Sequence, residues 1–553
     1  MTDAMSSVGA SDASSESGSP QPPRRASVER DSLWVAAGTT LSRVTGFARV
    51  FVLAWAIGQS DLADVYALAN TAPNLIYEFV VGGILSATLV PLFVRARERD
   101  DRDAASVLMS VGFVAAIALT LLAMGLTFGV DRWATARWED LDGQVSSWTQ
   151  FQSGMAMLYL FLPQILFYAI TSLTTAYLNA SRRYKTAAFA PVLTNVVSII
   201  AFVIVGFRLQ GRDDILDSTI FDSSTIYWLG IGTTAGIIAM TIPLLWEMRR
   251  LHNPLRFVPR FRHPIVSTLI RLSGWTFGYV AANQVALLFV ATTVTSLSRY
   301  QNAFIFFQLP HGLIAVSLMT TITPELASAV AAADYQALAD RFVRGLRLLA
   351  SLLLPAAVGY ALLAVPIASF LARGSLTAED ARLTGTTLAA FAIGLPAFSA
   401  YLYACRGFYA MSNTRTPFFL NLLENGANIA FVIVLSVSGR SSSAWFALAY
   451  SCSYAIAAVV ALRRLERAVT AKDPAVIRPS LDPLIKMAAA SVIMGLAVFA
   501  TRLVLSADRG TGALVSVAVG VVIGVATYAV AGLKLQIPEV TAAVANVRRR
   551  ARV

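Results

Sequence analysis

The chain has 553 residues, of which 56% are hydrophobic and only 14% are charged, and its mean hydropathy is +0.63. These values are typical of a polytopic membrane protein and argue against a soluble enzyme or binding module. The net charge of +12 does not indicate nucleic-acid binding, because Lys and Arg are dispersed among short loops between apolar runs. Two cysteines (Cys405, Cys452) and three histidines (His252, His263, His311) without companion ligands provide neither a disulfide framework nor a metal site.

Residues 1–32 are rich in Ser, Gly, Pro and Asp, so we expect a disordered cytoplasmic tail. About fourteen apolar segments long enough to span a bilayer follow. Six lie near 33–58, 62–94, 106–129, 154–180, 184–208 and 226–247, six near 265–296, 300–333, 343–372, 384–411, 416–438 and 442–463, and two near 483–505 and 511–533. The expected fold class is therefore an all-α polytopic membrane protein.

Basic residues mark every second loop between these segments. They occur at 95–102, 182–185, 249–262, 341–347, 415 and 463–472, and again at 548–552. The intervening loops at 131–142 and 213–222 carry acidic residues instead. Because cytoplasmic loops are enriched in Lys and Arg, this alternation favours fourteen spans with both termini in the cytoplasm.

An internal repeat relates the two sets of six spans. Span five contains Leu193-Thr194-Asn195 followed by Ala-Phe-Val-Ile-Val at 201–205, and span eleven contains Leu423-Glu424-Asn425 followed by the same five letters at 430–434. Repeats of six spans in one orientation predict two pseudo-symmetric lobes with a site between them. We assign 33–250 to an N-lobe, 251–480 to a C-lobe, and 481–553 to two further helices with a basic tail.

Two arginines lie inside the first apolar span. An arginine at bilayer depth costs about 2.5–3.5 kcal/mol on insertion scales, so it normally faces water or an anion. Helical geometry places Arg43 and Arg49 about 120° apart, with Gly46 halfway between them. This arrangement suits a large anion; the alternative is that one arginine, more readily Arg49, extends to the membrane surface.

The second span combines acidic and helix-distorting residues. Asp64 begins it, and Glu78 lies deeper, either as a partner of an arginine or as an independent cation or proton site. Pro73 and the pair Gly82-Gly83 weaken the backbone hydrogen bonds, so we expect a bend that gates a cavity. Close helix packing through glycine is the alternative explanation.

The second repeat supplies neutral and acidic oxygen ligands. Asn283, Glu424, Asn425 and Asn428, with Gln284 beside Asn283, form a candidate site for Na⁺ or a proton, with interhelical hydrogen bonding as the alternative. Arg299 stands before span eight, where it would add positive charge at the outer mouth. Span eight contains Pro310, which we expect at a second bend, together with Pro324.

An ordered set of motifs resembles a known family. Ser42-Arg43-Val44-x-Gly46-Phe47-x-Arg49, Ala63-Asp64, Pro73-Asn74-Leu75 and Val90-Pro91 resemble the MurJ (MviN) lipid II flippases, over about residues 33 to 535. The resemblance implies the fold of the multidrug/oligosaccharidyl-lipid/polysaccharide exporter superfamily, with two added C-terminal helices that help form a groove for the lipid tail. It also implies transfer of undecaprenyl-pyrophosphate-linked disaccharide-pentapeptide between leaflets of the bacterial plasma membrane.

The resemblance assigns roles to particular residues. Arg43 and Arg49 match the two cavity arginines of the family's first helix, and Asp64 matches the aspartate that opens the second. Where family members have further cavity arginines, this chain has Tyr77 and Ile305, so its cavity is less cationic. We include Tyr77, with Glu78 and Arg299, among the predicted substrate-binding residues.

Several functional hypotheses follow. The first is a lipid II flippase that works by alternating access, needs no cofactor, and is reset by Na⁺, H⁺ or the membrane potential. Its expected partners are lipid II, membrane lipids and proteins of cell-wall synthesis, and no nucleic acid. The alternatives are a flippase for another lipid-linked oligosaccharide, a cation/drug antiporter, or a membrane scaffold. No catalytic constellation or phosphate-binding loop is present in the sequence, so we do not expect an enzyme.

Overall fold

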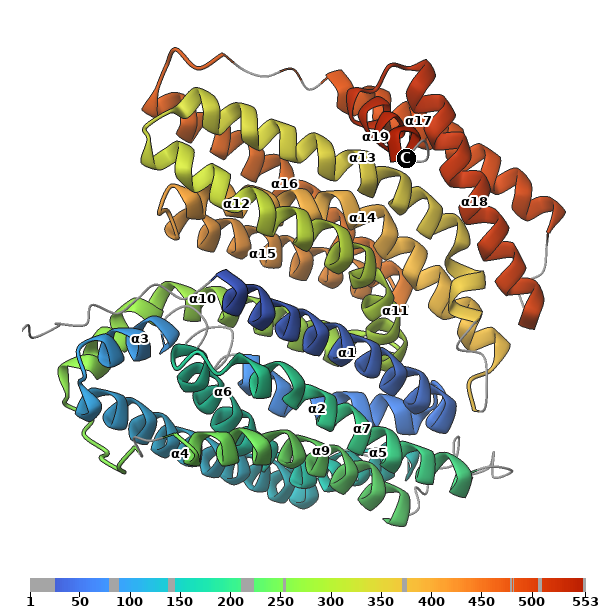
Figure 1. The fold of residues 1–553 in the computed structure, drawn as a ribbon. Coiled ribbons are helices and arrows are strands. Elements are labelled where there is room, and N and C mark those ends of the chain that lie inside the picture. The colour runs from blue at the N-terminus through green and yellow to red at the C-terminus, as the bar shows by residue number, and fades with distance from the viewer. Residues whose placement is uncertain are drawn as a thin grey trace, which may run out of the picture.

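The chain folds into a large helical assembly. A computed structural model describes residues 25–78, 89–137, 145–209, 223–251, 255–369, 375–477, 480, 482–505 and 510–550, and every regular element in these ranges is helical (Figure 1). Twelve helical segments among them are long and apolar enough to cross a membrane. The other two predicted spans also fall on helices, namely α2 (Asp61–Glu78) with α3 (Val90–Glu98), and α10 (Pro264–Thr293). The predicted all-α polytopic membrane fold is confirmed.

One group of helices, the N-lobe, forms the lower layer in Figure 1. Besides α2 and α3 it contains α1 (Arg25–Ile57), α4 (Arg102–Arg137), α5 (Val145–Phe161), α6 (Gln164–Ala180), α7 (Tyr184–Leu209) and α9 (Ser223–Arg249). Here α7 packs between α1 and α9, and α9 also contacts α5 and α6. Hydrogen bonds such as Gln164 Nε2 to Thr234 Oγ1 (2.8 Å) join these helices, as is typical where no water reaches the backbone or side chains.

A second group, the C-lobe, lies above the first in Figure 1, except for α10, which is level with α1 in this view. It comprises α10, α11 (Leu297–Pro310), the π-helical turn η3 (His311–Ala315), α12 (Val316–Ala331), α13 (Tyr335–Ala368), α14 (Ala378–Ala410), α15 (Arg415–Val437) and α16 (Ser443–Lys472). Helix α14 packs between α13 and α16. Gly394 allows α14 to approach α16, because a Cβ there would lie 2.7 Å from the Cα of Ser451.

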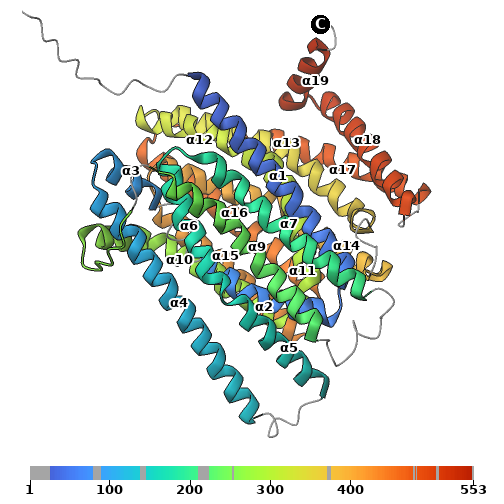
Figure 2. The same ribbon diagram turned by 60° about the horizontal axis from the view of Figure 1, so that its bottom comes forward.

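Three C-terminal helices lie on the outer side of the C-lobe, beside α13 (Figure 2). They are α17 (Asp482–Val504), α18 (Gly510–Lys534) and α19 (Pro538–Arg550). Apolar side chains on α17 and α18, such as Leu496, Phe499 and Val525, are exposed. A membrane supplies the apolar surroundings that such a surface requires.

One local feature differs from the prediction: α1 begins at Arg25, so residues 25–32, which we assign to the disordered tail from sequence, are helical. The fourth predicted span is present as the candidate membrane span Trp148–Ala180, within which α5 and α6 meet at Pro163, the N-cap of α6. The residue limits assigned to the lobes stay predictions.

Candidate functional site

A cavity of about 480 Å³ lies between the two lobes. The N-lobe wall comes from α1 and α2, and the C-lobe wall comes from α10, α11, α15 and α16. The cavity brings together seven of the residues selected from sequence: Arg49, Glu78, Asn283, Gln284, Glu424, Asn425 and Asn428. They lie up to 379 positions apart in the chain (Arg49 to Asn428), so it is the packing of the lobes that assembles the site.

Arg49 reaches this cavity because of the way α1 packs on α7. Asn195 of α7 donates hydrogen bonds through Nδ2 to the backbone oxygen of Ser42 and to Thr45 Oγ1, both at 3.0 Å. Gly46 faces the same asparagine: a Cβ on residue 46 would lie 3.4 Å from Asn195 Nδ2. These contacts fix the rotation of α1 about its axis, and α1 continues through Gly46 without a break.

Arg43 does not line this cavity with Arg49. It is exposed, and its Nη1 lies close to Gly312 of η3, where a Cβ would be 2.7 Å away. Phe47, which lies between the two arginines in the sequence, packs against Phe306 of α11 with ring centroids 5.2 Å apart. Phe51, two residues after Arg49, packs against the same ring at a centroid distance of 6.1 Å. An apolar contact between the lobes therefore lies at the level of the two cations.

Asp64 and Arg299 belong to a different place, the end of the molecule where α1 turns into α2. Here Asp64 Oδ1 accepts hydrogen bonds from the Ser298 backbone N–H (2.7 Å) and from Ser296 Oγ (3.1 Å), both at the start of α11. Asp64 thus joins the N-lobe to the C-lobe. We call Gln59, Asp64, Ser296, Arg299 and Asp380 the interlobe polar cluster.

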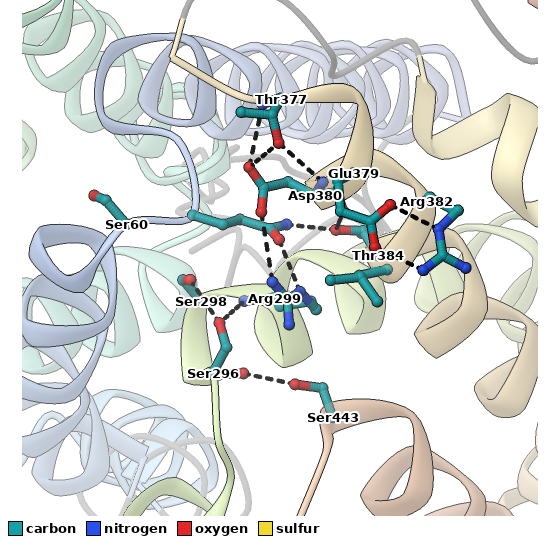
Figure 3. Close-up of polar contacts among 12 residues, drawn as sticks. Ser60, Ser296, Ser298, Arg299, Thr377, Glu379, Asp380, Arg382, Thr384 and Ser443 are labelled. Atoms are coloured by element: carbon teal, nitrogen blue, oxygen red, sulfur yellow. Dashed lines mark hydrogen bonds and ion pairs between the residues drawn. The ribbon is translucent and has the colours of Figure 1, made fainter. Parts of the chain in front are cut away.

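Arg299 is the centre of this cluster, and Figure 3 shows it beside Asp380 on the first turn of α14. Its Nη2 lies 3.5 Å from Asp380 Oδ1, and its Nε donates to Gln59 Oε1 at 2.9 Å. Gln59 in turn donates to Thr384 of α14. Asp380 is itself held by Thr377 in a capping box, so α14 presents a rigid acceptor to the arginine. Arg299 and Asp64 therefore lie in a lobe-to-lobe contact and do not line the 480 Å³ cavity.

Of the residues predicted to matter in the second span, Pro73 and Glu78 lie in the described part of α2. Helix α2 continues through Pro73 to Glu78, which is exposed and lines the cavity. The side chain of Tyr77 and the predicted hinge residues Gly82 and Gly83 lie outside what the structure describes. The role of these three positions stays a prediction.

The C-lobe wall contains a network of carboxamides. Asn283 Oδ1 accepts from Asn421 Nδ2 (2.7 Å) and Asn425 Nδ2 (2.8 Å), and the buried Glu424 accepts from Ser453 Oγ at 2.9 Å. Asn421 is not among the residues selected from sequence. Its spacing of four residues from Asn425, one helical turn, was the available signal.

Pro310 coincides with a break in the regular helix. The π-helical turn η3 follows it directly, and His311 at the start of this turn is buried, with Nδ1 2.9 Å from Ser399 Oγ. π-Helical turns insert one residue into an α-helix and concentrate at functional positions. The predicted bend of span eight thus falls on an irregular segment close to Arg43, whose Nη1 would lie 2.7 Å from a Cβ at Gly312.

Comparisons with known proteins decide the family. A family model described as lipid II flippase MurJ matches residues 53–507. The chain belongs to the lipid II flippase MurJ family. A probable lipid II flippase MurJ of Thermotoga maritima is 26% identical over 520 residues, which cover 92% of this chain and 97% of the relative. The lipid II flippase MurJ of Burkholderia cenocepacia is 29% identical over 406 residues, covering 70% and 74%. The resemblance seen in the motifs of spans one and two is confirmed.

Solved structures show the same fold. A lipid II flippase MurJ in an inward closed conformation has a TM-score of 0.72 at 20% identity and covers 91% of this chain and 99% of its own. An inward-facing multidrug resistance transporter of the MATE family, in the MOP superfamily, has a TM-score of 0.64 at 12% identity and covers 78% and 96%. At these identities the likeness establishes the fold alone, and the MurJ family assignment rests on the sequence match.

Proposed function

We propose that the chain is a flippase that moves lipid II, a polyprenyl-pyrophosphate-linked peptidoglycan precursor, from the inner to the outer leaflet of the bacterial inner membrane. The family match supports this function, and one structural observation carries it: Arg49 lies on the wall of a cavity between two membrane lobes. Its planar guanidinium stays charged at all relevant pH values and binds phosphate oxygens in a bidentate manner. Flipping makes and breaks no covalent bond, so the protein acts as a transporter and not as an enzyme.

Alternating access supplies the mechanism. The interlobe polar cluster closes the α1–α2 end, and the loop charges favour the outer side of the membrane for this end, with both termini in the cytoplasm. Cargo would enter between the lobes from the cytoplasmic side, with Arg43 meeting the pyrophosphate before Arg49. Separation of Asp64 from the start of α11 would then open the outer side. Bending at Pro73 and at Pro310 with η3 would accommodate the lobe motion.

The reset of the cycle requires a driving force, for which we propose a cation, a proton or the membrane potential. Glu424 and the carboxamides Asn283, Asn425 and Asn428 supply oxygen atoms beside the cavity. Hard cations prefer such ligands. Membrane lipids would contact the exposed apolar surface of α17 and α18, and proteins of cell-wall synthesis are further proposed partners.

Alanine variants of the two arginines in cells depleted of the native protein test this function. We expect Arg49→Ala, alone and together with Arg43→Ala, to stop growth while lipid-linked precursor accumulates. Arg132→Ala is the control, because Arg132 is exposed on α4 far along the chain from the cavity-lining residues. Lost drug efflux with normal wall synthesis would instead favour an antiporter, and unaffected growth of the double variant would contradict the role of the arginines.

A further inference from the structure

The cavity between the lobes is lined mainly by groups that a pyrophosphate does not need. Among its described lining residues only Arg49, Glu78 and Glu424 are ionisable at neutral pH. The remaining polar groups are mostly carboxamides, which come from both lobes: Asn70, Asn74, Asn283, Gln284, Gln301 and Asn428 belong to this set. Neutral amides add little to the binding of a multiply charged phosphate, so this wall indicates a second, uncharged part of the ligand.

Carboxamides and aromatic rings together suit a sugar. Each amide offers two donors and one acceptor oxygen, which matches the adjacent hydroxyl and acetamido groups of a saccharide. Tyr300, Phe304 and Tyr450 line the same cavity, and aromatic rings pack favourably against the apolar C–H groups of a sugar. The volume of about 480 Å³ lies within the range of about 300–1,000 Å³ that is usual for small-molecule sites.

Two acceptors on the C-lobe side lack partners. Gln284 Oε1 and Asn428 Oδ1 are buried and accept no hydrogen bond, although their residues are only 8% and 4% exposed. A buried acceptor without a donor is unfavourable, so both oxygens are expected to find donors in another state of the cycle. Sugar hydroxyl and N–H groups are such donors. Gln301, one turn from Phe304 and Ile305 on α11, uses its Nε2 for a 3.3 Å contact with Thr71 across the lobes.

We propose that Gln284, Gln301 and Asn428 bind the sugar that adjoins the pyrophosphate, and that they make the protein select glycosylated cargo over sugar-free polyprenyl pyrophosphate. This inference rests on the proposed function and adds the residues that determine specificity. Arg49 binds the pyrophosphate, and the carboxamides of Gln284, Gln301 and Asn428 form hydrogen bonds with the sugar beside it. Asn428 then serves the cargo, and the proposal of a coupling cation or proton rests mainly on Glu424.

Leaflet exchange of two labelled probes in proteoliposomes tests the inference. The probes are lipid II and undecaprenyl pyrophosphate, and the measured quantity is the ratio of their exchange rates. Gln301→Met and Asn428→Leu remove an amide at similar volume, and Asn302→Leu is the matched control because Asn302 adjoins Gln301 on α11 without lining the cavity. Each wall variant should lower the ratio of lipid II exchange to exchange of the sugar-free probe about threefold to tenfold. The control should keep the wild-type ratio.

The two exchange rates distinguish a failure of the sugar site from a failure of the proposed flippase function. Poor folding of a variant slows exchange of both probes in proportion, so it does not change the ratio of their rates. A wild-type ratio in both wall variants therefore overturns the sugar site. A changed Na⁺ dependence at an unchanged ratio also overturns it, in favour of a cation site. If the wild-type protein exchanges neither probe, the proposed function fails as well. Wild-type exchange of both probes at equal rates leaves the function standing and contradicts the sugar site alone.

Discussion

Asp64 offers the sharpest test of how the lobes are held together. Its carboxylate accepts two hydrogen bonds from the start of α11, at 2.7 and 3.1 Å, and both cross from one lobe to the other. A hydrogen bond to a charged acceptor contributes about 1.5–3 kcal/mol to stability. Burial of the carboxylate costs desolvation free energy, which offsets part of what the two hydrogen bonds to Asp64 contribute together. Asp64→Ala should therefore weaken closure of the α1–α2 end by about 1.5–3 kcal/mol, which shifts the closed-to-open ratio roughly 10- to 150-fold.

Distances between spin labels on the two lobes measure this shift. Labels at Phe207→Cys on α7 and Thr386→Cys on α14 occupy exposed positions, with Cys405 and Cys452 replaced by alanine. Asp61→Ala is the matched control: Asp61 lies one turn earlier on α2, and its carboxylate accepts from Gln150 of the same lobe at 2.8 Å. We expect a longer-distance population in Asp64→Ala only. An unchanged distribution in Asp64→Ala, or an equal shift in both variants, would refute the role of Asp64 as a link between the lobes.

Two further predictions concern packing. Gly394→Ala places a Cβ 2.7 Å from the Cα of Ser451, so it should destabilise the protein by about 1–3 kcal/mol. Gly426→Ala should not, because among the described residues its Cβ would meet no atom beyond its own stretch of helix within 4 Å. Thermal unfolding in detergent measures both, and equal melting temperatures would contradict the close approach of α14 and α16. Asn195→Ala removes both hydrogen bonds from α7 to α1 and should cost about 1–2 kcal/mol, visible as a melting temperature lower by several degrees. An unchanged melting temperature together with unchanged exchange of lipid II would show that these bonds do not position α1.

The sequence predicts much of the helical architecture because its signals are local. Apolar length and the alternation of loop charge identify the spans, and an arginine such as Arg49 stands out because its cost in a membrane demands an explanation. From sequence, Arg43 and Arg49 look like one anion-binding pair, but only Arg49 lines the cavity. Their separation depends on how α1 is rotated against α7 and α11, and periodicity within one helix does not determine that rotation.

The interlobe polar cluster was not predictable for a similar reason. Asp64 and Arg299 were both selected, yet their partners Ser298, Gln59 and Asp380 lie far away in the chain or carry no distinguishing pattern. Packing of the two lobes creates these contacts. The carboxamides of the cavity wall present a similar case, since a single asparagine in an apolar helix is more often an interhelical hydrogen-bond partner than a ligand contact.

Reconstituted exchange of lipid II is the most direct measurement of the central claim, that a cavity arginine between two lobes carries a pyrophosphate across the membrane. We expect the wild-type protein to accelerate leaflet exchange of labelled lipid II over protein-free liposomes. Arg49→Ala should lose about 10- to 100-fold of this acceleration, because a charge-assisted contact is removed, and Arg132→Ala should retain it. Absence of exchange by the wild-type protein, or full exchange by Arg49→Ala, would contradict the account.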